Sequence, residues 1–245
     1  LTTIPYLVAG ALLGGFVNGL AGTGTALFAL GFFLLVFDPV TAVAIVALMS
    51  ILAGLQGLWI VRNAIFANPV RLLRFLIPGL IGVPIGILAL KTLDARTLRI
   101  GIAAFLVIYG SYFSFRRVLP RFERRTPILD SIVGLIGGIM GGAASVSGAI
   151  PVMWLSIRPW PKAETRAVLQ PFNVAVLGTT VTLLALRGDA TALQALMVIV
   201  PVGLIGAQIG IMVFKRISDD TFRRLLIGLT LIVGLGIFLQ ELTSA

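Results

Sequence analysis

The sequence predicts an all-α membrane protein that crosses the lipid bilayer several times. Of its 245 residues, 58% are hydrophobic and only 11% are charged, and the mean hydropathy is +1.09. Soluble domains carry about a quarter charged residues, so this composition is typical of a membrane protein. Eight long apolar runs and an internal duplication support the same fold class and indicate two related halves.

Six of the apolar runs have the length of one transmembrane helix, because a hydrocarbon core of about 30 Å needs about 20 helical residues. The predicted spans are residues 40–61, 70–90, 98–115, 163–186, 192–214 and 222–239. The other two runs, residues 2–37 and 128–157, are too long for one span, and small, polar breaks interrupt them at residues 21–25 and 143–148. Each therefore predicts a re-entrant hairpin of two short helices, which a membrane tolerates only where protein or a cavity surrounds it.

The two halves of the chain repeat each other at an offset of 124 residues. Residues 79–87, GLIGVPIGI, match residues 203–211, GLIGAQIGI. The match continues at Lys91 and Lys215, Thr97 and Thr221, and Arg99 and Arg223, and the same offset places Gly10, Gly14 and Gly24 on Gly134, Gly138 and Gly148. Polar matches at a fixed spacing favour a true duplication over chance similarity between apolar strings. We predict two repeats, residues 1–115 and 128–245, joined by a basic linker at residues 116–127.

The basic residues predict the membrane topology. If all eight runs crossed the membrane, the 19 Lys and Arg would divide ten to nine between the two sides. If both broken segments return to the side they entered from, 15 of the 19, Arg166 included, lie on one side, which the positive-inside rule makes cytoplasmic. Each half then has one re-entrant hairpin and three spans, and the halves are inverted repeats. Both termini are predicted to be periplasmic and the linker cytoplasmic.

The composition excludes several kinds of site. The chain has no Cys and no His, which removes thiolate and Ser-His nucleophiles, Cys/His zinc sites and haem ligation by either residue. No metal or cofactor is predicted, and an intramembrane Ser-Lys enzyme is disfavoured because the lysines lie at the ends of spans. The net charge of +10 follows the ends of the apolar runs, so it indicates membrane topology and not a nucleic-acid surface.

The two broken tips form the candidate substrate site, because inverted-repeat transporters bind substrates where interrupted helices meet near the midplane. Helices that begin near Thr25 and Gly148 present free N–H groups and a positive dipole end to an anion, so no buried arginine is required. The candidate residues are Gly22, Thr23, Gly24, Thr25, Ser145, Ser147 and Gly148 at the tips, Asn18 one turn earlier, and Gln170 and Asn173 on a shared helix face.

The alternative role for these residues is structural. Small residues let helices pack closely, and side-chain amides bond across helices. We favour close packing for the glycines Gly10, Gly14, Gly82, Gly86, Gly206 and Gly210, and substrate binding for the tips.

The glycine-rich residues 10–24, GALLGGFVNGLAGTG, are repeated more loosely at residues 134–151. With the paired GLIG segments and the basic linker, they make the chain resemble the TauE/SafE family of sulfite and organosulfonate exporters. The resemblance covers essentially the whole chain. It implies a permease of the bacterial inner membrane that moves sulfite, sulfoacetate or similar small sulfonates, and it leaves self-association into a homo-oligomer open.

The sequence therefore predicts a secondary transporter that exports small sulfur-containing oxyanions by alternating access around the two tips. A passive anion channel is the alternative, but an open pore needs a continuous polar path and the predicted spans hold almost no charge. A membrane subunit without a substrate is a further alternative. It is disfavoured because two broken helices are costly to fold unless a site lies between them.

Overall fold

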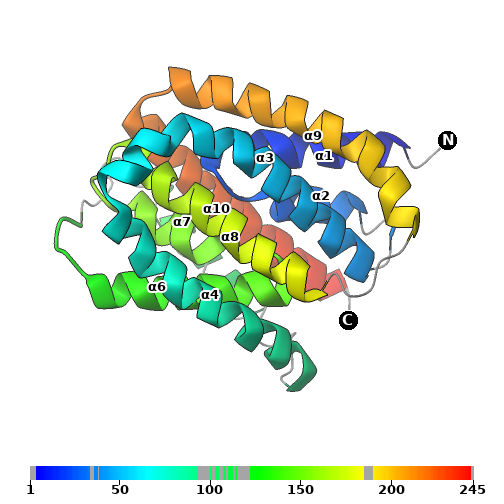
Figure 1. The fold of residues 1–245 in the computed structure, drawn as a ribbon, viewed down its shortest axis with the longest axis horizontal. Helices are drawn as coiled ribbons and strands as arrows, with labels where there is room; N and C mark the ends of the chain where they lie inside the picture. The colour runs from blue at the N-terminus through cyan, green and yellow to red at the C-terminus, as the bar shows by residue number, and fades with distance from the viewer. Residues whose placement is uncertain are drawn as a thin grey trace.

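The computed structural model describes residues 4–33, 36–37, 39–92, 100, 103–104, 107–108, 110–112, 114, 122–184 and 190–243. Its helices are α1 (Ile4–Ala21), α2 (Thr25–Phe33), α3 (Pro39–Ala67), α4 (Pro69–Thr92), α6 (Pro127–Ala144), α7 (Ala149–Ser156), α8 (Lys162–Leu184), α9 (Ala190–Arg216) and α10 (Asp219–Thr243) (Figure 1). These ranges contain no strand, which confirms the all-α class. Half of the predicted span 98–115 and half of the linker, residues 116–121, lie outside the described residues.

Both long apolar runs are broken as predicted. Residues 22–24 separate α1 from α2, and residues 145–148 separate α6 from α7. The short helix α2 folds back along α1, since a Cβ added to Gly14 would lie 2.8 Å from Ala29 Cβ and one added to Gly10 would lie 2.9 Å from Phe32 Cβ. The hairpin thus has one arm of 18 residues and one of nine.

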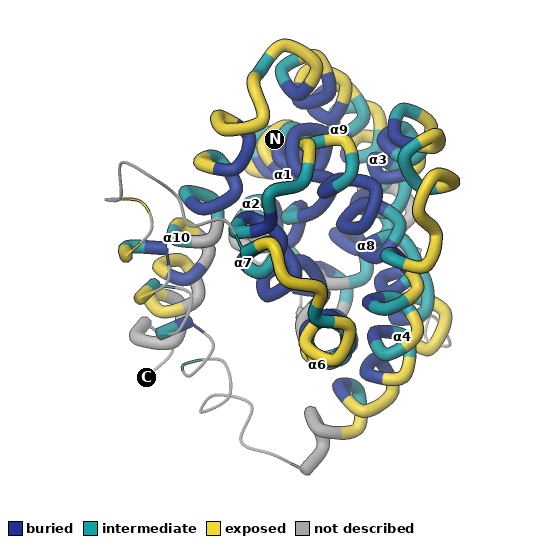
Figure 2. The backbone as a smooth tube through the Cα atoms, turned by 90° about the vertical axis from the view of Figure 1, so that its left-hand side faces the viewer, coloured by how far each residue is buried: buried dark blue, intermediate teal, exposed yellow. Residues whose placement is uncertain are grey.

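Within the described ranges, four helical segments are long and apolar enough to cross a membrane. They are Ile4–Ala21, Ala44–Ala67, Pro69–Leu88 and Leu196–Arg216. Figure 2 shows buried residues along the inner faces of the helices and exposed residues along the outer faces. Large apolar side chains occupy the outer faces, with Trp59 70% exposed and Ile81 and Ile205 57% and 58% exposed. Such a surface suits a lipid environment.

Two close helix pairs, α1 with α9 and α4 with α6, form opposite edges of the bundle (Figure 1). Glycines make the close approach possible, because a Cβ on Gly15 would overlap the backbone of Gly203 and a Cβ on Gly138 would overlap that of Gly79. The GLIG glycines Gly82 and Gly206 are packed in the same way. These contacts confirm the packing role that the sequence favours for them.

The contacts of the α1–α9 pair correspond to those of the α4–α6 pair, but the number of residues between equivalent positions is not constant along the chain. Gly15 and Gly138 are 123 residues apart (138 − 15), whereas their partners Gly79 and Gly203 are 124 apart (203 − 79). The first break, residues 22–24, is one residue shorter than the second, residues 145–148, which accounts for the difference. By these contacts Gly14 aligns with Gly137, one residue away from the position that a uniform offset of 124 gives.

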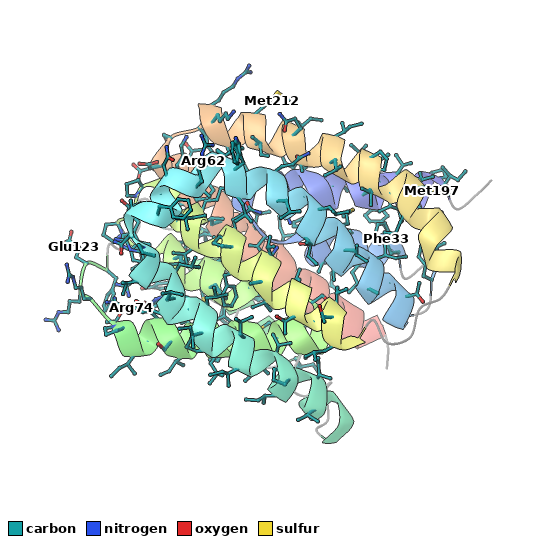
Figure 3. The ribbon with its side chains drawn as sticks, in the orientation of Figure 1. Phe33, Arg62, Arg74, Glu123, Met197 and Met212 are labelled. Carbon is teal, nitrogen blue, oxygen red and sulfur yellow. The ribbon has the colours of Figure 1, made fainter. Side chains whose placement is uncertain are left out.

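One end of the bundle gathers the segments that the positive-inside rule assigns to a single side. Figure 3 places Arg62, Arg74 and Glu123 at this end, and α1 begins and α10 ends at the opposite end (Figure 1). Hydrogen bonds from basic side chains join the turns and the linker there. Lys162 Nζ donates to Phe214 O at 2.8 Å, Arg223 Nη2 to Trp160 O at 3.3 Å and Arg158 Nη1 to Phe122 O at 3.3 Å. We call this end of the bundle the basic end.

The first prediction concerns topology. Single cysteines placed in this Cys-free chain at Ala95, which lies outside the described residues, and at Ser218 should react with a membrane-impermeant maleimide from opposite sides of the membrane, because the predicted inverted repeats place the corresponding loops of the two halves on opposite sides. Asn68→Cys, in the turn between α3 and α4, is the control and should react from the same side as Ser218→Cys. Labelling of Ala95→Cys and Ser218→Cys from one side would refute the inverted arrangement.

The second prediction concerns the α4–α6 pair. Gly138→Ala should destabilise the protein by about 1–3 kcal/mol, because the added Cβ overlaps the Gly79 backbone and forces the two helices apart. Gly178→Ala is the matched control, since its Cβ meets no described heavy atom within 4 Å, and it should be neutral or stabilise α8 by up to about 1 kcal/mol. Thermal unfolding in detergent measures both. Equal effects of the two variants would contradict the packing analysis.

Candidate functional site

The backbone at each break adopts a conformation that ends one helix and starts the next in a new direction. Gly22 and Gly24 have positive φ angles of 84° and 97°, which glycine adopts without steric cost. Ser145 caps α6 with a φ of 55°, and its N–H donates to Gly141 O at 2.9 Å. For a residue other than glycine, a left-handed backbone conformation raises the conformational energy by of order 1 kcal/mol. It therefore occurs mainly where the surrounding structure enforces it.

The two tips touch each other in the core. A Cβ on Gly148 would overlap the side chain of Thr23, so only glycine fits at this position. Both tips also bond to one atom of α8, the Oδ1 of Asn173. Thr23 Oγ1 donates to it at 3.1 Å and Ser147 Oγ at 2.7 Å. One amide oxygen therefore joins segments that lie more than 120 residues apart in the sequence.

A second set of hydrogen bonds extends the cluster from Asn173 to the first hairpin. Asn173 Nδ2 donates to Ser50 Oγ at 3.1 Å, and Asn18 Nδ2 donates to the same hydroxyl at 2.9 Å and to Thr25 Oγ1 at 2.8 Å. Gln170 Nε2 donates to Asn18 Oδ1 at 3.2 Å. All five side chains are buried, so the cluster is a connected polar network inside an apolar bundle.

Arg166 adds a charge to this network. Its Nε donates to Gln170 Oε1 at 3.1 Å, and its Cζ lies 4.5 Å from the ring centre of Phe214. The side chain is 0% exposed, and neither Nη1 nor Nη2 has a hydrogen-bond partner among the described residues. Gly22 and Gly57 leave room for it, because a Cβ on Gly22 would lie 3.3 Å from Arg166 Cγ and one on Gly57 2.7 Å from Nη2.

Most residues of this cluster are candidates that the sequence predicts. Asn18, Thr23, Thr25, Ser147, Gln170 and Asn173 bond to one another or to Ser50, and Gly22 and Gly148 lie against Gln170 and Thr23. Ser145 is buried, but its Oγ has no hydrogen-bond partner among the described residues. Gly24 lies in the first break, between α1 and α2.

Two members of the cluster were missed. Ser50 is a single hydroxyl in the long apolar helix α3, and nothing in its local sequence distinguishes it. Arg166 was counted among the cytoplasmic loop charges, which is wrong, because it lies inside α8 and is fully buried. Its spacing carried the signal: Arg166, Gln170 and Asn173 stand at positions i, i+4 and i+7, which share one helix face.

Comparison with known protein families identifies this chain by nearly its whole length. A family model described as "Sulfite exporter TauE/SafE" matches residues 7–237, nearly the whole chain. No curated protein matches the chain.

The third prediction tests the role of Asn173 in stability. Asn173→Leu should lower the free energy of unfolding by about 1–3 kcal/mol, because it leaves the buried hydroxyls of Thr23 and Ser147 without an acceptor. Gln56→Leu is the control, since the buried Oε1 of Gln56 has no hydrogen-bond partner in the described part of the chain, and its removal should leave stability unchanged or raised. Thermal unfolding in detergent separates the two, and an unchanged midpoint for Asn173→Leu would contradict the network.

Proposed function

Because this chain belongs to the TauE/SafE sulfite exporter family of membrane transporters, we propose that it is a secondary transporter that exports small sulfur-containing oxyanions such as sulfite or organosulfonates. We propose that the bacterial inner membrane is its location and that the two broken tips and the polar face of α8 bind the substrate. The family consists of transporters and not enzymes, so the chain carries out no covalent chemistry on its substrate.

The observation that carries this proposal is the meeting of both tips at Asn173. The hydroxyls of Thr23 and Ser147, the amide of Asn173 and the first turns of α2 and α7 converge in one buried region. These groups are hydrogen-bond donors, and the first-turn N–H groups of a helix favour negative charge. Hydroxyl and amide groups rotate easily, so each can exchange its present partner for an oxygen of a bound oxyanion.

The burial of the network supports alternating access over a passive channel. Asn18 and Gln170 are 0% exposed, and Thr23 and Asn173 are 3% and 2% exposed. An anion reaches such groups only when helices move apart on one side of the site. A channel would instead show polar groups in contact with water along an open path. The breaks between α1 and α2 and between α6 and α7 are natural points for such motion.

The grouping of charge supports an orientation. We propose that the basic end faces the cytoplasm, since positively charged segments are retained on that side of bacterial inner membranes. The linker then lies in the cytoplasm, and both termini lie in the periplasm. The substrate of an exporter approaches from the basic end, where lysines and arginines raise the local concentration of anions.

The fourth prediction tests the tips by transport. In proteoliposomes, Thr23→Leu and Ser147→Leu should each reduce uptake of labelled sulfite or methanesulfonate at least about tenfold, because a bulky apolar side chain replaces a donor in a closely packed contact. Thr182→Leu makes the same kind of change at an exposed position of α8 and should transport normally. Folding of each variant is checked by its thermal midpoint. Normal transport by both tip variants would refute the proposed site, and uptake that never saturates would favour the channel.

A further inference from the structure

A purely structural role explains the surroundings of Arg166 poorly. A buried charge is costly unless hydrogen bonds and an opposite charge compensate it. Arg166 has one hydrogen bond, from Nε to the neutral amide of Gln170, and the ring of Phe214 beside it. Its two terminal nitrogens have no partner among the described residues, although the side chain is 0% exposed.

A second buried arginine shows what a structural role looks like in this fold. Arg158 is 3% exposed and forms an ion pair with Asp130 at 2.9 Å. Its terminal nitrogens also donate to the Thr126 hydroxyl and to the carbonyls of Phe122 and Arg124. Both terminal nitrogens are thus paired, and they tie the linker to α6. Arg166 differs from Arg158 in that no carboxylate of the described residues pairs with it.

We propose that the guanidinium of Arg166 supplies the positive charge that binds the transported anion. This inference rests on the proposed function and identifies the charge partner within that site. A guanidinium presents two parallel N–H groups that match two oxygens of a sulfonate, and it stays charged at neutral pH. The free atoms, Nη1 and Nη2, are the ones that make such a bidentate contact.

The position of Arg166 places this charge on the route to the tips. Arg166 lies about one helical turn inside α8, which begins at Lys162 at the basic end. Its stem packs near Gly22 of the first break, and Gln170 connects it to Asn18. An anion that enters from the basic end meets Arg166 before it reaches Thr23 and Ser147.

The charge balance also predicts which anions are preferred. One unpaired guanidinium in a buried site is neutralised by one negative charge, whereas a doubly charged anion leaves a net charge in a low-dielectric interior. Arg166 forms no ion pair with any carboxylate in the described part of the chain. We therefore infer selectivity for singly charged oxyanions, such as alkylsulfonates and hydrogen sulfite, over sulfate and sulfoacetate.

The experiment measures anion binding by the thermal midpoint of the full chain in detergent. The probes are methanesulfonate with one charge, sulfate with two and the uncharged methanesulfonamide. For the wild type, methanesulfonate at 100 times its Kd should raise the midpoint by about 5–10 °C. Sulfate should bind at least about tenfold more weakly, and methanesulfonamide should give no shift.

The variants separate a binding role from a structural one. Arg166→Met should lose the methanesulfonate shift while its own midpoint is unchanged or higher, because an uncompensated buried charge has been removed. Arg158→Met is the matched control: its midpoint should fall by at least about 5 °C, because Asp130 loses its partner, but it should keep the methanesulfonate shift. Arg166→Lys retains the positive charge but lacks the two parallel N–H groups of the guanidinium. It should bind methanesulfonate with an affinity at least about tenfold lower than the wild type.

Each outcome decides the matter. The inference is overturned if Arg166→Met binds methanesulfonate within about twofold of the wild type, if the wild type prefers sulfate, or if it binds none of the three probes. Failure of both Arg166→Met and Arg166→Gln to fold would also overturn it, since that result assigns a structural role. If the protein transports sulfite and transport does not depend on Arg166, the inference fails but the proposed function stands. If Arg166 is needed to bind methanesulfonate but the protein transports no sulfite, the proposed function fails and only the anion-binding role of Arg166 stands.

Discussion

The rest of the structure depends on the hydrogen bonds that both broken helices make to Asn173. A helix break inside a membrane leaves backbone and side-chain polar groups that lipid cannot satisfy. Here each break is buried against the other and against α8, where one amide accepts from Thr23 and from Ser147. The glycine contacts of α1 with α9 and of α4 with α6 hold the two hairpins close enough for this arrangement. Close packing at the glycines and hydrogen bonding at the centre therefore act together to satisfy the polar groups of the two helix breaks.

Arg158 and Arg166 are buried in different surroundings, which fit a stabilising role for the first and the proposed anion-binding role for the second. Arg158 is held by a carboxylate, a hydroxyl and two carbonyls, and these bonds fix the linker against the start of α6. Arg166 is held by a neutral amide and an aromatic ring, which position the guanidinium without cancelling its charge. A site that must release its ligand benefits from a charge that the protein itself does not neutralise.

Much of this fold is readable from the sequence because membranes impose simple rules on it. Lengths of apolar runs predicted most of the helices, and runs too long for one span predicted the two breaks, which the structure places at residues 22–24 and 145–148. Candidate site residues followed from the breaks, since hydroxyls and glycines at a helix interruption have few other uses. Arg166 was misassigned because it stands close to a predicted span end, and the rule that places charges in loops outweighed its helical spacing. Ser50 was missed because its partners come from other helices.

The polar face of α8 has no equivalent in the other half of the chain. At an offset of 124, Arg166, Gln170 and Asn173 correspond to Ala42, Val46 and Met49 of α3, which are all apolar. In a transporter with two identical inverted repeats, the inward-open and outward-open forms would be related by a two-fold axis in the membrane plane and would have equal energy. In the proposed inverted arrangement, the polar face that α8 alone supplies makes the two forms unequal in energy, so the empty carrier has one preferred resting form.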